Sequence, residues 1–586
     1  MKYLYTRKRE RVVNQNEIVG YIWSAAELLR GDYKQSKYGD IILPFTVLRR
    51  LDCVLEPTKG TVQQENEGLT AYGVNDAIRD EALFAITGVK FYNTSSFTLE
   101  RLRNDPNQIA RNLQSYIDGF SKDVSDIFDK FKFAETIADL NDKGLLFQLV
   151  SLFVGLDLGP DAVDDLQMGT VYEELIRRFS EMSNETAGEH FSPRDGLKLA
   201  VDLLISGSED DLSKPGSIVY AYDPCAGTGG ALSLFESRVK EYYGNAKVYC
   251  YGQELNPETF ATCKADMLLR GENANHIAYG NTLTNDAFNR SFAYQISNPP
   301  YGVDWKKYAK PIKDEYANLG YNGRFGAGLP RVSDGQLLFI EHMVSKMRNP
   351  EDGGGRIAVF MNGSPLFTGN AGSGESNIRR WLLEERDLVE AIVAMPTDFF
   401  YNTGIATYIW ILSNHKPAER KGKVQLIDAG KVSTKMRQSL GKKRNMLSDE
   451  QIEAIVREYQ AFEDTEMSKI FDVQEFGYTT VTVLQPERDE NGGIRRGRKG
   501  DPKSDKSLMD TENIPLSEDI DEYFEREVKP YAPDAWMDRS KDKVGYEIPF
   551  TRYFYKYTPL RASSEIAEDL KTLEASIAEH LAELGL

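Results

Sequence analysis

A four-residue box, Asn298-Pro299-Pro300-Tyr301, combines side chains that suit chemistry on an NH₂ group. The two prolines lack backbone N–H groups and have a fixed φ, so backbone carbonyls are left pointing outward as acceptors. The Asn298 side chain adds an acceptor oxygen, and Tyr301 adds a flat face for a planar substrate. An amide or exocyclic NH₂ needs two acceptors for its protons while its lone pair meets an electrophile. The box therefore predicts group transfer to such a nitrogen.

A glycine turn earlier in the chain indicates a ligand with an ammonium group. An apolar run ends at Asp223 and continues into Gly227-Thr228-Gly229, where a tight turn exposes backbone N–H groups. The dinucleotide fingerprint G-x-G-x-x-G would need a glycine at Leu232, so this turn does not match it. A carboxylate at the end of a strand can bind an ammonium group, which a dinucleotide lacks.

A second carboxylate indicates that the same ligand contains a ribose. Glu254 follows the next β-rich run, 25 residues after Gly229, where an acidic side chain can accept both hydroxyls of an adenosine ribose. With Asp223 it predicts a pocket for adenosine that carries an amino-acid tail, which is S-adenosylmethionine. Each glycine alone is more often an ordinary strand-to-helix turn. Asn298 lies 75 residues after Asp223, downstream of both pocket signals, which favours a shared site.

The three motifs need a parallel sheet to bring them together. From about Val171 onward, helices alternate with short β-rich runs, a pattern typical of a sheet with helices on its faces. The expected strands are 217–222, 248–253, 276–279, 292–296, 356–360, 388–394 and 407–412. Asp223, Glu254 and Asn298 each follow one of them, at the carboxyl ends where open α/β sheets place their chemistry. The stretch 302–334, rich in Gly, Lys and Tyr, is expected to be a long functional loop.

Helical sequence flanks this predicted sheet on both sides. Apolar residues recur at three- and four-residue steps in the first 165 residues, in the runs 18–29, 47–55, 109–120, 124–131 and 145–156. The chain ends in a helix with a narrow apolar seam about two heptads long, formed by Ile566, Leu570, Leu573, Ile577, Leu581 and Leu584. Such a helix docks either on its own domain or on another protein, and the sequence leaves both open.

The charge balance restricts how the chain could meet nucleic acid. With 71 Lys and Arg against 90 Asp and Glu, its net charge is −19. That argues against a protein that coats nucleic acid through charge, because phosphate affinity comes mainly from Lys and Arg. A DNA enzyme with local or borrowed basic residues stays possible. Two basic clusters, at 435–444 and 495–506, are equally consistent with solvated surface charge.

Several other classes are disfavoured by composition. No apolar stretch reaches the roughly 20 residues that a membrane span needs. Cysteines and histidines form neither C-x-x-C nor H-x-x-H spacings, which argues against a disulfide framework and a zinc site. The sequence therefore predicts a cytoplasmic protein without a metal.

Together, these motifs resemble the N6-adenine DNA methyltransferases in which the cofactor site precedes the catalytic box. The resemblance extends upstream to Glu189-His190-Phe191-Ser192-Pro193-Arg194, similar to an element that caps the methionine end of the cofactor. It extends downstream through 336–340, 354–360 and 396–405. With the helical N-terminal region and the seamed tail, nearly the whole chain resembles the modification subunit of type I restriction-modification systems.

The resemblance implies an α/β fold with a Rossmann-like, S-adenosylmethionine-dependent core. A helical N-terminal domain would span 1–165, the methyltransferase domain 166–475, and a C-terminal extension with a partner-binding helix 476–586. It implies in-line methyl transfer to N6 of an adenine flipped out of double-stranded DNA. The implied cofactor-binding residues are Glu189, His190, Phe191, Ser192, Asp223, Gly227, Thr228, Gly229, Glu254 and Asn281.

Catalysis falls on Asn298, Pro299, Pro300 and Tyr301 in this interpretation. Asn298 and the Pro299 carbonyl would bind the two N6 protons, Tyr301 would stack on the flipped base, and Phe400 would cover the opposite face. The sequence departs from the family at two places. Ser192 stands where the family often has Thr, which keeps the hydroxyl. Asn281 stands where many relatives have Asp, and its side-chain oxygen can still accept from an amino group.

The resemblance also implies partners. Such subunits pair two to one with a specificity subunit that reads the DNA site, and with a restriction subunit that cuts. The chain shows no target-recognition module and no G-x-x-x-x-G-K-[ST] loop, so it should modify but neither choose nor cleave. One rival is a methyltransferase of glutamine side-chain amides, like the much smaller release-factor enzymes. The other is a scaffold or DNA-binding subunit whose chemistry has lapsed, which the intact motifs argue against.

Overall fold

The computed structural model describes most of the chain, in two units. The described residues are 15–182, 192–207, 212–244, 246–401, 403–440, 442–497, 500–555 and 563–583. One unit comprises residues 1–547 and the other residues 548–586. No helix within the described ranges is long and apolar enough to cross a membrane.

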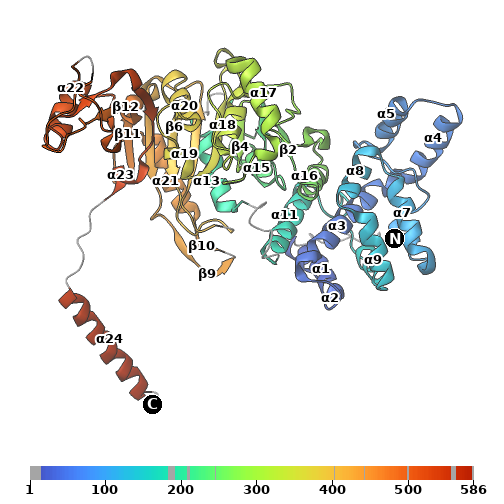
Figure 1. Cartoon of the computed structure of the whole chain (residues 1–586). Coiled ribbons are helices and arrows are strands. Elements are labelled where there is room, and N and C mark those ends of the chain that lie inside the picture. The colour runs from blue at the N-terminus through green and yellow to red at the C-terminus, as the bar shows by residue number, and fades with distance from the viewer. Residues whose placement is uncertain are drawn as a thin grey trace, which may run out of the picture. The chain divides into compact units, whose positions relative to one another are not determined.

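Helices fill the N-terminal part of the large unit, as the periodic apolar residues predict (Figure 1). They are α1 (Gln15–Trp23), α2 (Ala25–Leu29), α3 (Tyr38–Leu55), α4 (Lys59–Ala71), α5 (Asp76–Thr87), α6 (Leu99–Leu102), α7 (Ile109–Asp118), α8 (Lys122–Lys130), α9 (Phe133–Asp142), α10 (Leu146–Val154) and α11 (Asp165–Met182). The expected run 18–29 is two helices, separated at Ser24. The predicted runs left out α4, α5, α6 and α9. Helices α4 and α5 each bury a single residue, Val62 and Leu83, and so have no apolar stripe to detect.

A nine-stranded sheet forms the centre of the large unit, in the order β11-β8-β6-β7-β5-β4-β1-β2-β3. Its strands are β1 (Ile218–Asp223), β2 (Lys247–Glu254), β3 (Ile277–Tyr279), β4 (Tyr294–Ser297), β5 (Arg356–Asn362), β6 (Val389–Ala394), β7 (Thr407–Ser413), β8 (Lys423–Asp428) and β11 (Ser468–Asp472). All seven expected strands are present, and each begins and ends within two residues of its expected bounds. Strands β8 and β11 extend the sheet. Only β7 and β11 pair with their neighbours in antiparallel fashion.

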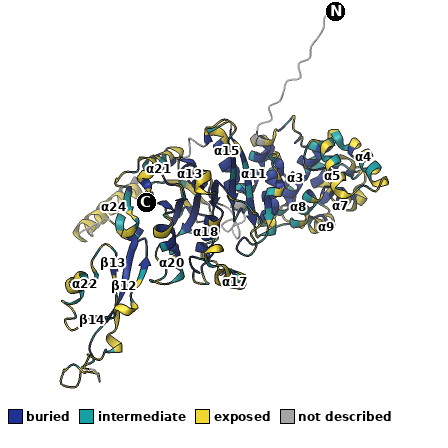
Figure 2. Ribbon diagram, turned by 90° about the horizontal axis from the view of Figure 1, so that it is seen from above, coloured by how far each residue is buried: buried dark blue, intermediate teal, exposed yellow. Residues whose placement is uncertain are grey.

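Helices lie on the faces of this sheet, and the residues in contact with them are buried (Figure 2). They are α13 (Arg194–Ile205), α15 (Gly230–Tyr242), α16 (Pro257–Leu269), α18 (Gln336–Ser345), α19 (Ser364–Phe367), α20 (Gly374–Arg380) and α21 (Asp449–Ala461). The chain leaves β1 toward β2 on one side, whereas β4 pairs with β1 on the other. That reversal opens a crevice at the carboxyl ends of β1 and β4, where such sheets bind ligands.

The stretch 302–334 is more ordered than the expected long loop. It contains α17 (Ala309–Leu319). Trp305, Ile312 and Phe325 are buried together with Leu338 of α18 in a small core of their own. The expectation of a long loop was therefore wrong for the part that forms α17, because a few scattered aromatic and aliphatic residues suffice to fold the segment against α18.

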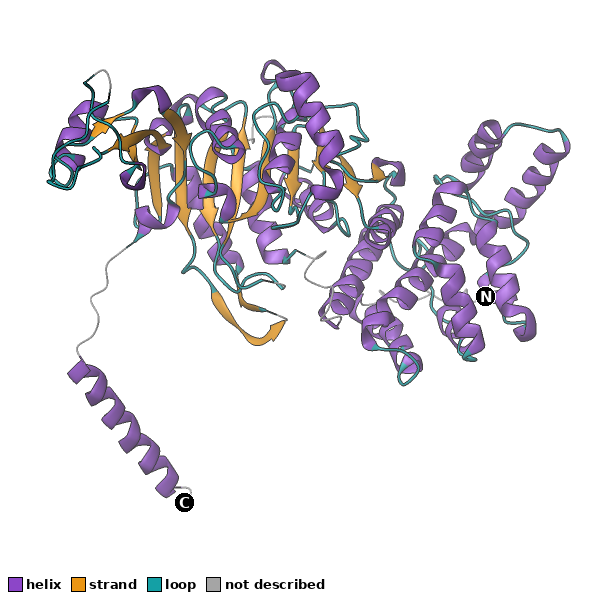
Figure 3. Ribbon diagram, viewed as in Figure 1, coloured by secondary structure: helices purple, strands orange, loops and turns teal. Residues whose placement is uncertain are grey.

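Two smaller sheets follow the large one. β9 (Thr434–Leu440) and β10 (Lys443–Met446) form a hairpin that extends beyond the nine-stranded sheet (Figure 3). Strand β12 (Gly477–Leu484) pairs with β13 (Asp510–Pro515), β14 (Trp536–Met537) and β15 (Lys543–Tyr546). The predicted division into 1–165, 166–475 and 476–586 stays a prediction.

The terminal unit contains α23 (Phe550–Phe554) and α24 (Ser563–Glu583). Helix α24 is the predicted seamed helix, and its seam residues are 43% to 62% exposed: Ile566, Leu570, Leu573, Ile577 and Leu581. Leu584 lies outside the described residues.

Candidate active site

A cavity of about 970 Å³ opens at the ends of β1, β2 and β4. Most of the residues predicted for cofactor and catalysis line it together: Ser192, Asp223, Gly227, Thr228, Glu254, Asn281, Asn298, Pro299, Pro300, Tyr301 and Phe400. Gly229 is not among the lining residues. Glu189, His190 and Phe191 lie outside the described residues, so their predicted role stays a prediction.

Asp223 is held at the end of β1 by two hydrogen bonds. Ser297 Oγ donates to Asp223 Oδ1 at 2.7 Å, and the backbone N–H of Cys225 donates to the same oxygen at 2.9 Å. Among the described residues, no donor bonds to Oδ2. Burial raises the pKa of Asp223 to about 7, and the nearby charge of Glu254 adds to this effect. An ammonium group beside Oδ2 would favour the ionised form.

Glu254 supports the glycine turn from the end of β2. Its Oε2 accepts from the backbone N–H of Gly227 at 2.8 Å, and its Oε1 accepts from the backbone N–H of Asn256 at 2.7 Å. These bonds fix the carboxylate in the cavity wall. Each carboxylate oxygen can accept more than one hydrogen bond, so both remain able to take a ribose hydroxyl.

Gly229 allows the tight turn before α15 and does not line the cavity. It precedes α15 with a φ of +88°, in the left-handed region that favours glycine. A Cβ there would lie 2.9 Å from Cys263 Sγ in α16. Both the conformation and the close approach therefore require glycine, and they fix how α15 starts beside the cavity.

Asn281 follows β3 and faces the same cavity. Its Oδ1 accepts from the backbone N–H of Leu283 at 2.9 Å. Because a backbone N–H can only donate, this contact places the amide oxygen on that side. The oxygen has one lone pair left for an amino group, so the predicted role of Asn281 is chemically feasible and stays a prediction.

The Asn298 side chain lies in a short chain of hydrogen bonds. Its Nδ2 donates to Ser192 Oγ at 2.8 Å, and the Tyr301 hydroxyl donates to its Oδ1 at 2.5 Å. Burial raises the pKa of Tyr301, so this hydroxyl stays neutral and remains a donor. Ser192 and Tyr301 thus define which end of the amide is the acceptor, with one lone pair of Oδ1 still available.

Phe400 lies edge-on to Tyr301. The two ring centroids are 6.2 Å apart and the ring planes meet at 81°. Phe400 is only 3% exposed and also packs edge-on against Phe360 and Phe399. Stacking of a base between parallel Tyr301 and Phe400 rings would require one ring to turn, so the predicted role of Phe400 stays a prediction.

The residues that line the cavity fit S-adenosylmethionine. Two buried carboxylates end adjacent strands, and the Gly227 turn brings backbone against the cavity between them. The two carboxylates can accept hydrogen bonds from an ammonium group and from ribose hydroxyls on one ligand. Among the described residues, no cluster of three His, Cys, Asp or Glu side chains could hold a metal ion.

A family model described as N-6 DNA Methylase matches residues 163–482, more than half of the chain. The chain belongs to the N-6 DNA methylase family. A second model, described as the HsdM N-terminal domain, matches residues 18–153 within helices α1 to α10. Membership of this family makes the chain a DNA methyltransferase, as the sequence predicts.

Known relatives of this N-6 DNA methylase belong to type I restriction enzymes. The MjaIX methylase subunit of Methanocaldococcus jannaschii is 25% identical over 544 residues, 90% of each chain. The MpnII methylase subunit of Mycoplasma pneumoniae is 26% identical over 490 residues, 77% of this chain and 84% of that protein. The resemblance to type I modification subunits, predicted from sequence, is confirmed.

A solved structure shares the fold. The methyltransferase subunit of a type I restriction-modification system from Streptococcus thermophilus aligns with a TM-score of 0.61 and 23% identity. The alignment covers 79% of this chain and 97% of that one. The predicted α/β methyltransferase fold with a helical N-terminal domain is confirmed.

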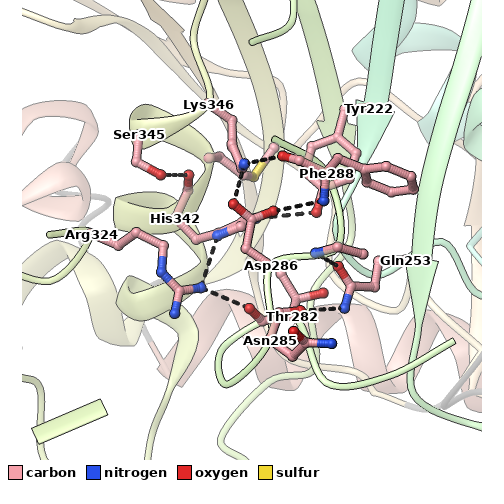
Figure 4. A network of polar contacts seen from close by, with 12 residues as sticks. Tyr222, Gln253, Thr282, Asn285, Asp286, Phe288, Arg324, His342, Ser345 and Lys346 are labelled. Carbon is pink, nitrogen blue, oxygen red and sulfur yellow. Dashed lines mark hydrogen bonds and ion pairs between the residues drawn. The ribbon is translucent and has the colours of Figure 1, made fainter. Parts of the chain in front are cut away.

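A polar network that the sequence motifs did not reveal supports the Asn281 loop of this N-6 DNA methylase (Figure 4). Arg324 donates to the carbonyls of Thr282 at 2.8 Å and Leu283 at 3.0 Å. Glu315 of α17 holds the guanidinium through an ion pair of 2.6 Å. The folded 302–334 segment is thus tied to the side of the cavity that Asn281 lines. The residues in these contacts are about 40 positions apart in sequence, so no local pattern could reveal them.

His342 of α18 completes this network as a neutral ring. Its Nδ1 faces Arg324 Nη1 at 3.3 Å, and its Nε2 lies 3.1 Å from the Tyr222 hydroxyl. Arginine can only donate, so Nδ1 must be the acceptor and Nε2 carries the proton. Burial, and the charges of Arg324 and Lys346, lower the pKa of His342 well below its usual range. The ring therefore links β1 to α18 without adding a charge to the network.

Proposed function

We propose that this chain transfers the methyl group of S-adenosylmethionine to N6 of adenine in DNA, as the modification subunit of a type I restriction-modification system. The observation that carries the proposal is that the Asn298 box and the Asp223 and Glu254 strand ends open into one cavity. A cofactor and a flipped base would then meet at the carboxyl ends of β1 and β4.

The chain's own residues would hold the cofactor from several sides. Asp223 would bind its ammonium group, Glu254 its ribose hydroxyls and Asn281 its adenine amino group. The Ser192 segment, together with Glu189, His190 and Phe191, would cover the methionine end. S-adenosylmethionine supplies an electrophilic methyl group on a sulfonium.

The catalytic box would orient the target amino group. Asn298 Oδ1 and the Pro299 carbonyl would accept the two N6 protons, which directs the nitrogen lone pair toward the sulfonium methyl. Tyr301 would stack on the base, a contact worth about 1–3 kcal/mol that offsets the few kcal/mol spent on flipping. The methylated nitrogen is strongly acidic and loses its proton to water. Catalysis would rest on orientation, with no charged base.

Partners would supply what this chain lacks. Its relatives are methylase subunits of type I enzymes, so we expect two copies to bind one specificity subunit, which chooses the DNA site. A restriction subunit would join the full complex. The apolar seam of α24 and the net charge of −19 both support a subunit that depends on a partner to bind DNA. We expect the complex to act in the cytoplasm, on host DNA.

The test replaces Asn298 in the full chain, purified with its specificity subunit. Asn298→Ala should abolish transfer of labelled methyl groups to adenine in unmethylated host DNA, because the N6 protons lose an acceptor. Equilibrium binding of labelled S-adenosylmethionine should persist. Asn377→Ala, on the exposed side of α20, is the matched control and should retain full activity. Adenine methylation by the Asn298→Ala enzyme would refute the mechanism.

A further inference from the structure

The β9–β10 hairpin carries positive charge that the chain does not neutralise. Four basic side chains on it are exposed: Lys435, Arg437, Lys442 and Arg444. None of them forms an ion pair with a carboxylate in the part of the chain that the structure describes. Such a group of unpaired cations is unexpected in a protein with a net charge of −19. We refer to these four residues as the hairpin cations.

The second basic cluster differs from the hairpin cations. Arg495 and Lys503 both pair with Glu487, at 2.8 Å and 2.5 Å. Arg488, beside this cluster, pairs with Asp534 at 2.5 Å. Two of the four described cations at 495–506 are therefore paired with a carboxylate, whereas none of the hairpin cations is. Of the two clusters singled out in the sequence, the hairpin presents the more available positive charge.

The base of the hairpin is fixed to the wall of the active site. Lys443 is buried and pairs with Asp195 of α13 at 3.1 Å, with its ammonium 3.8 Å from the centre of the Phe399 ring. The backbone N–H groups of Lys442 and Arg444 donate to the carbonyls of Tyr401 and Asp398, at 2.9 Å and 2.8 Å.

These contacts set the hairpin beside the cavity mouth. The segment 397–401 that holds it contains Phe400 and is followed by Thr403 and Ile405, and all three residues line the cavity. Asp195 lies three residues after Ser192, which lines the cavity near Asn298. The hairpin therefore projects from the two segments that flank the site where a base would enter.

We propose that the hairpin cations bind the phosphate backbone of the DNA strand that carries the flipped adenine. The inference rests on the proposed function, because a base in the cavity requires its strand to pass the cavity mouth. Lys435 and Arg437 are two residues apart in β9, so they lie on one face of the ribbon. Contacts to phosphate position a duplex without reading its sequence, which suits a subunit that leaves recognition to a partner.

The test compares two double variants of the full chain, each in complex with its specificity subunit. Lys435→Gln with Arg437→Gln removes two hairpin cations. Arg495→Gln with Lys503→Gln removes the same charge from the locally paired cluster. Binding of a duplex that contains the methylation site is measured against salt concentration, together with binding of labelled S-adenosylmethionine and thermal unfolding.

The hairpin variant should bind the duplex more weakly than the wild type. Its plot of log affinity against log salt should flatten by about 0.9 for each phosphate that the variant no longer binds. Cofactor binding, complex assembly and the unfolding temperature should match those of the wild type. The paired-cluster variant should keep the wild-type slope.

Three outcomes would overturn the inference. A wild-type slope in the hairpin variant, with the wild type active, would remove DNA as the partner while leaving the proposed function intact. Loss of the specificity subunit from the purified hairpin variant would assign these cations to an acidic protein surface. Absence of DNA methylation by the wild-type complex would refute the proposed function itself, and the hairpin inference with it.

Discussion

Ser192 orients the amide on which the proposed chemistry depends. Removal of its hydroxyl leaves Asn298 Nδ2 without the acceptor that it has at 2.8 Å. A hydrogen bond of this kind is worth about 1 kcal/mol, so Ser192→Ala should lower kcat about fivefold. Ser192→Thr keeps the hydroxyl and should restore the rate. Steady-state kinetics of methyl transfer separate this effect from a change in KM for the cofactor, and an unchanged kcat in Ser192→Ala would argue against the orienting role.

Asp223 should make cofactor binding depend on pH. Its pKa of about 7 means that the carboxylate is only about one-tenth ionised at pH 6. Since the ionised form is the one that binds an ammonium group, affinity for S-adenosylmethionine should rise roughly tenfold from pH 6 to pH 8. Isothermal titration across this range measures the effect. Asp223→Asn should bind weakly at every pH, and a pH-independent wild type would contradict the assignment.

The raised pKa of Asp223 also makes the stability of the cofactor-free protein depend on pH, in the opposite direction to cofactor binding. Burial disfavours the ionised form of Asp223, so its contribution to the free energy of unfolding is most favourable below the pKa of a free aspartate, near 4. That contribution is lost as the pH rises through about 7. Bound cofactor should offset the loss by pairing the charge.

At the scale of elements, the start of α15 depends on Gly229. Gly229→Ala combines a positive φ with a Cβ only 2.9 Å from Cys263 Sγ, and we expect a loss of about 1–3 kcal/mol in the free energy of unfolding. Gly216→Ala is the matched control, because Gly216 has a φ of +77° and no atom within 4 Å of the added Cβ. Denaturant unfolding of both variants isolates the cost of the close approach to Cys263.

A second-site change tests this account. Cys263→Ala removes the sulfur that the new Cβ would meet, so it should recover part of the loss in Gly229→Ala and leave the cost of the positive φ. If Gly229→Ala were no less stable than Gly216→Ala, the close packing between α15 and α16 would not determine the choice of glycine.

Elements were predictable from sequence where one face or both faces of a segment are apolar. Most of the runs that became β1 to β7 are largely buried, and Asp223, Glu254 and Asn298 mark the ends of β1, β2 and β4. Helix α4 was not predicted, because it packs through a single buried valine and shows no apolar periodicity. The hydrogen bonds from Arg324 to the loop that contains Asn281 were not predicted either. The partners of Arg324 are distant in sequence, and arginine is common on protein surfaces.

At the scale of the molecule, we expect α24 to act in assembly independently of cofactor binding. Leu570→Lys with Ile577→Lys places two charges in the exposed seam and should abolish co-purification with the specificity subunit, because an apolar interface excludes unpaired charge. Cofactor binding by the isolated chain should not change. Thr572→Lys with Ala575→Lys adds the same charge on the opposite side of the helix and should leave assembly intact.

The alternative for this helix gives a different result. If the seam docks on the chain's own large unit, the first pair of substitutions should lower the unfolding temperature of the isolated chain while assembly continues. The sequence leaves these two possibilities open, and the two outcomes separate them.

Helix α16 belongs to two cores at once. Ala261, Ala265 and Leu268 pack into the core of the helical N-terminal region, whereas Phe260, Cys263 and Met267 pack against the sheet. The helix also begins directly after Glu254 and Asn256. The N-terminal region is therefore no interchangeable module: a chimera that takes its helices from a relative must take one face of α16 as well, or expose an apolar stripe on a helix that begins three residues after Glu254.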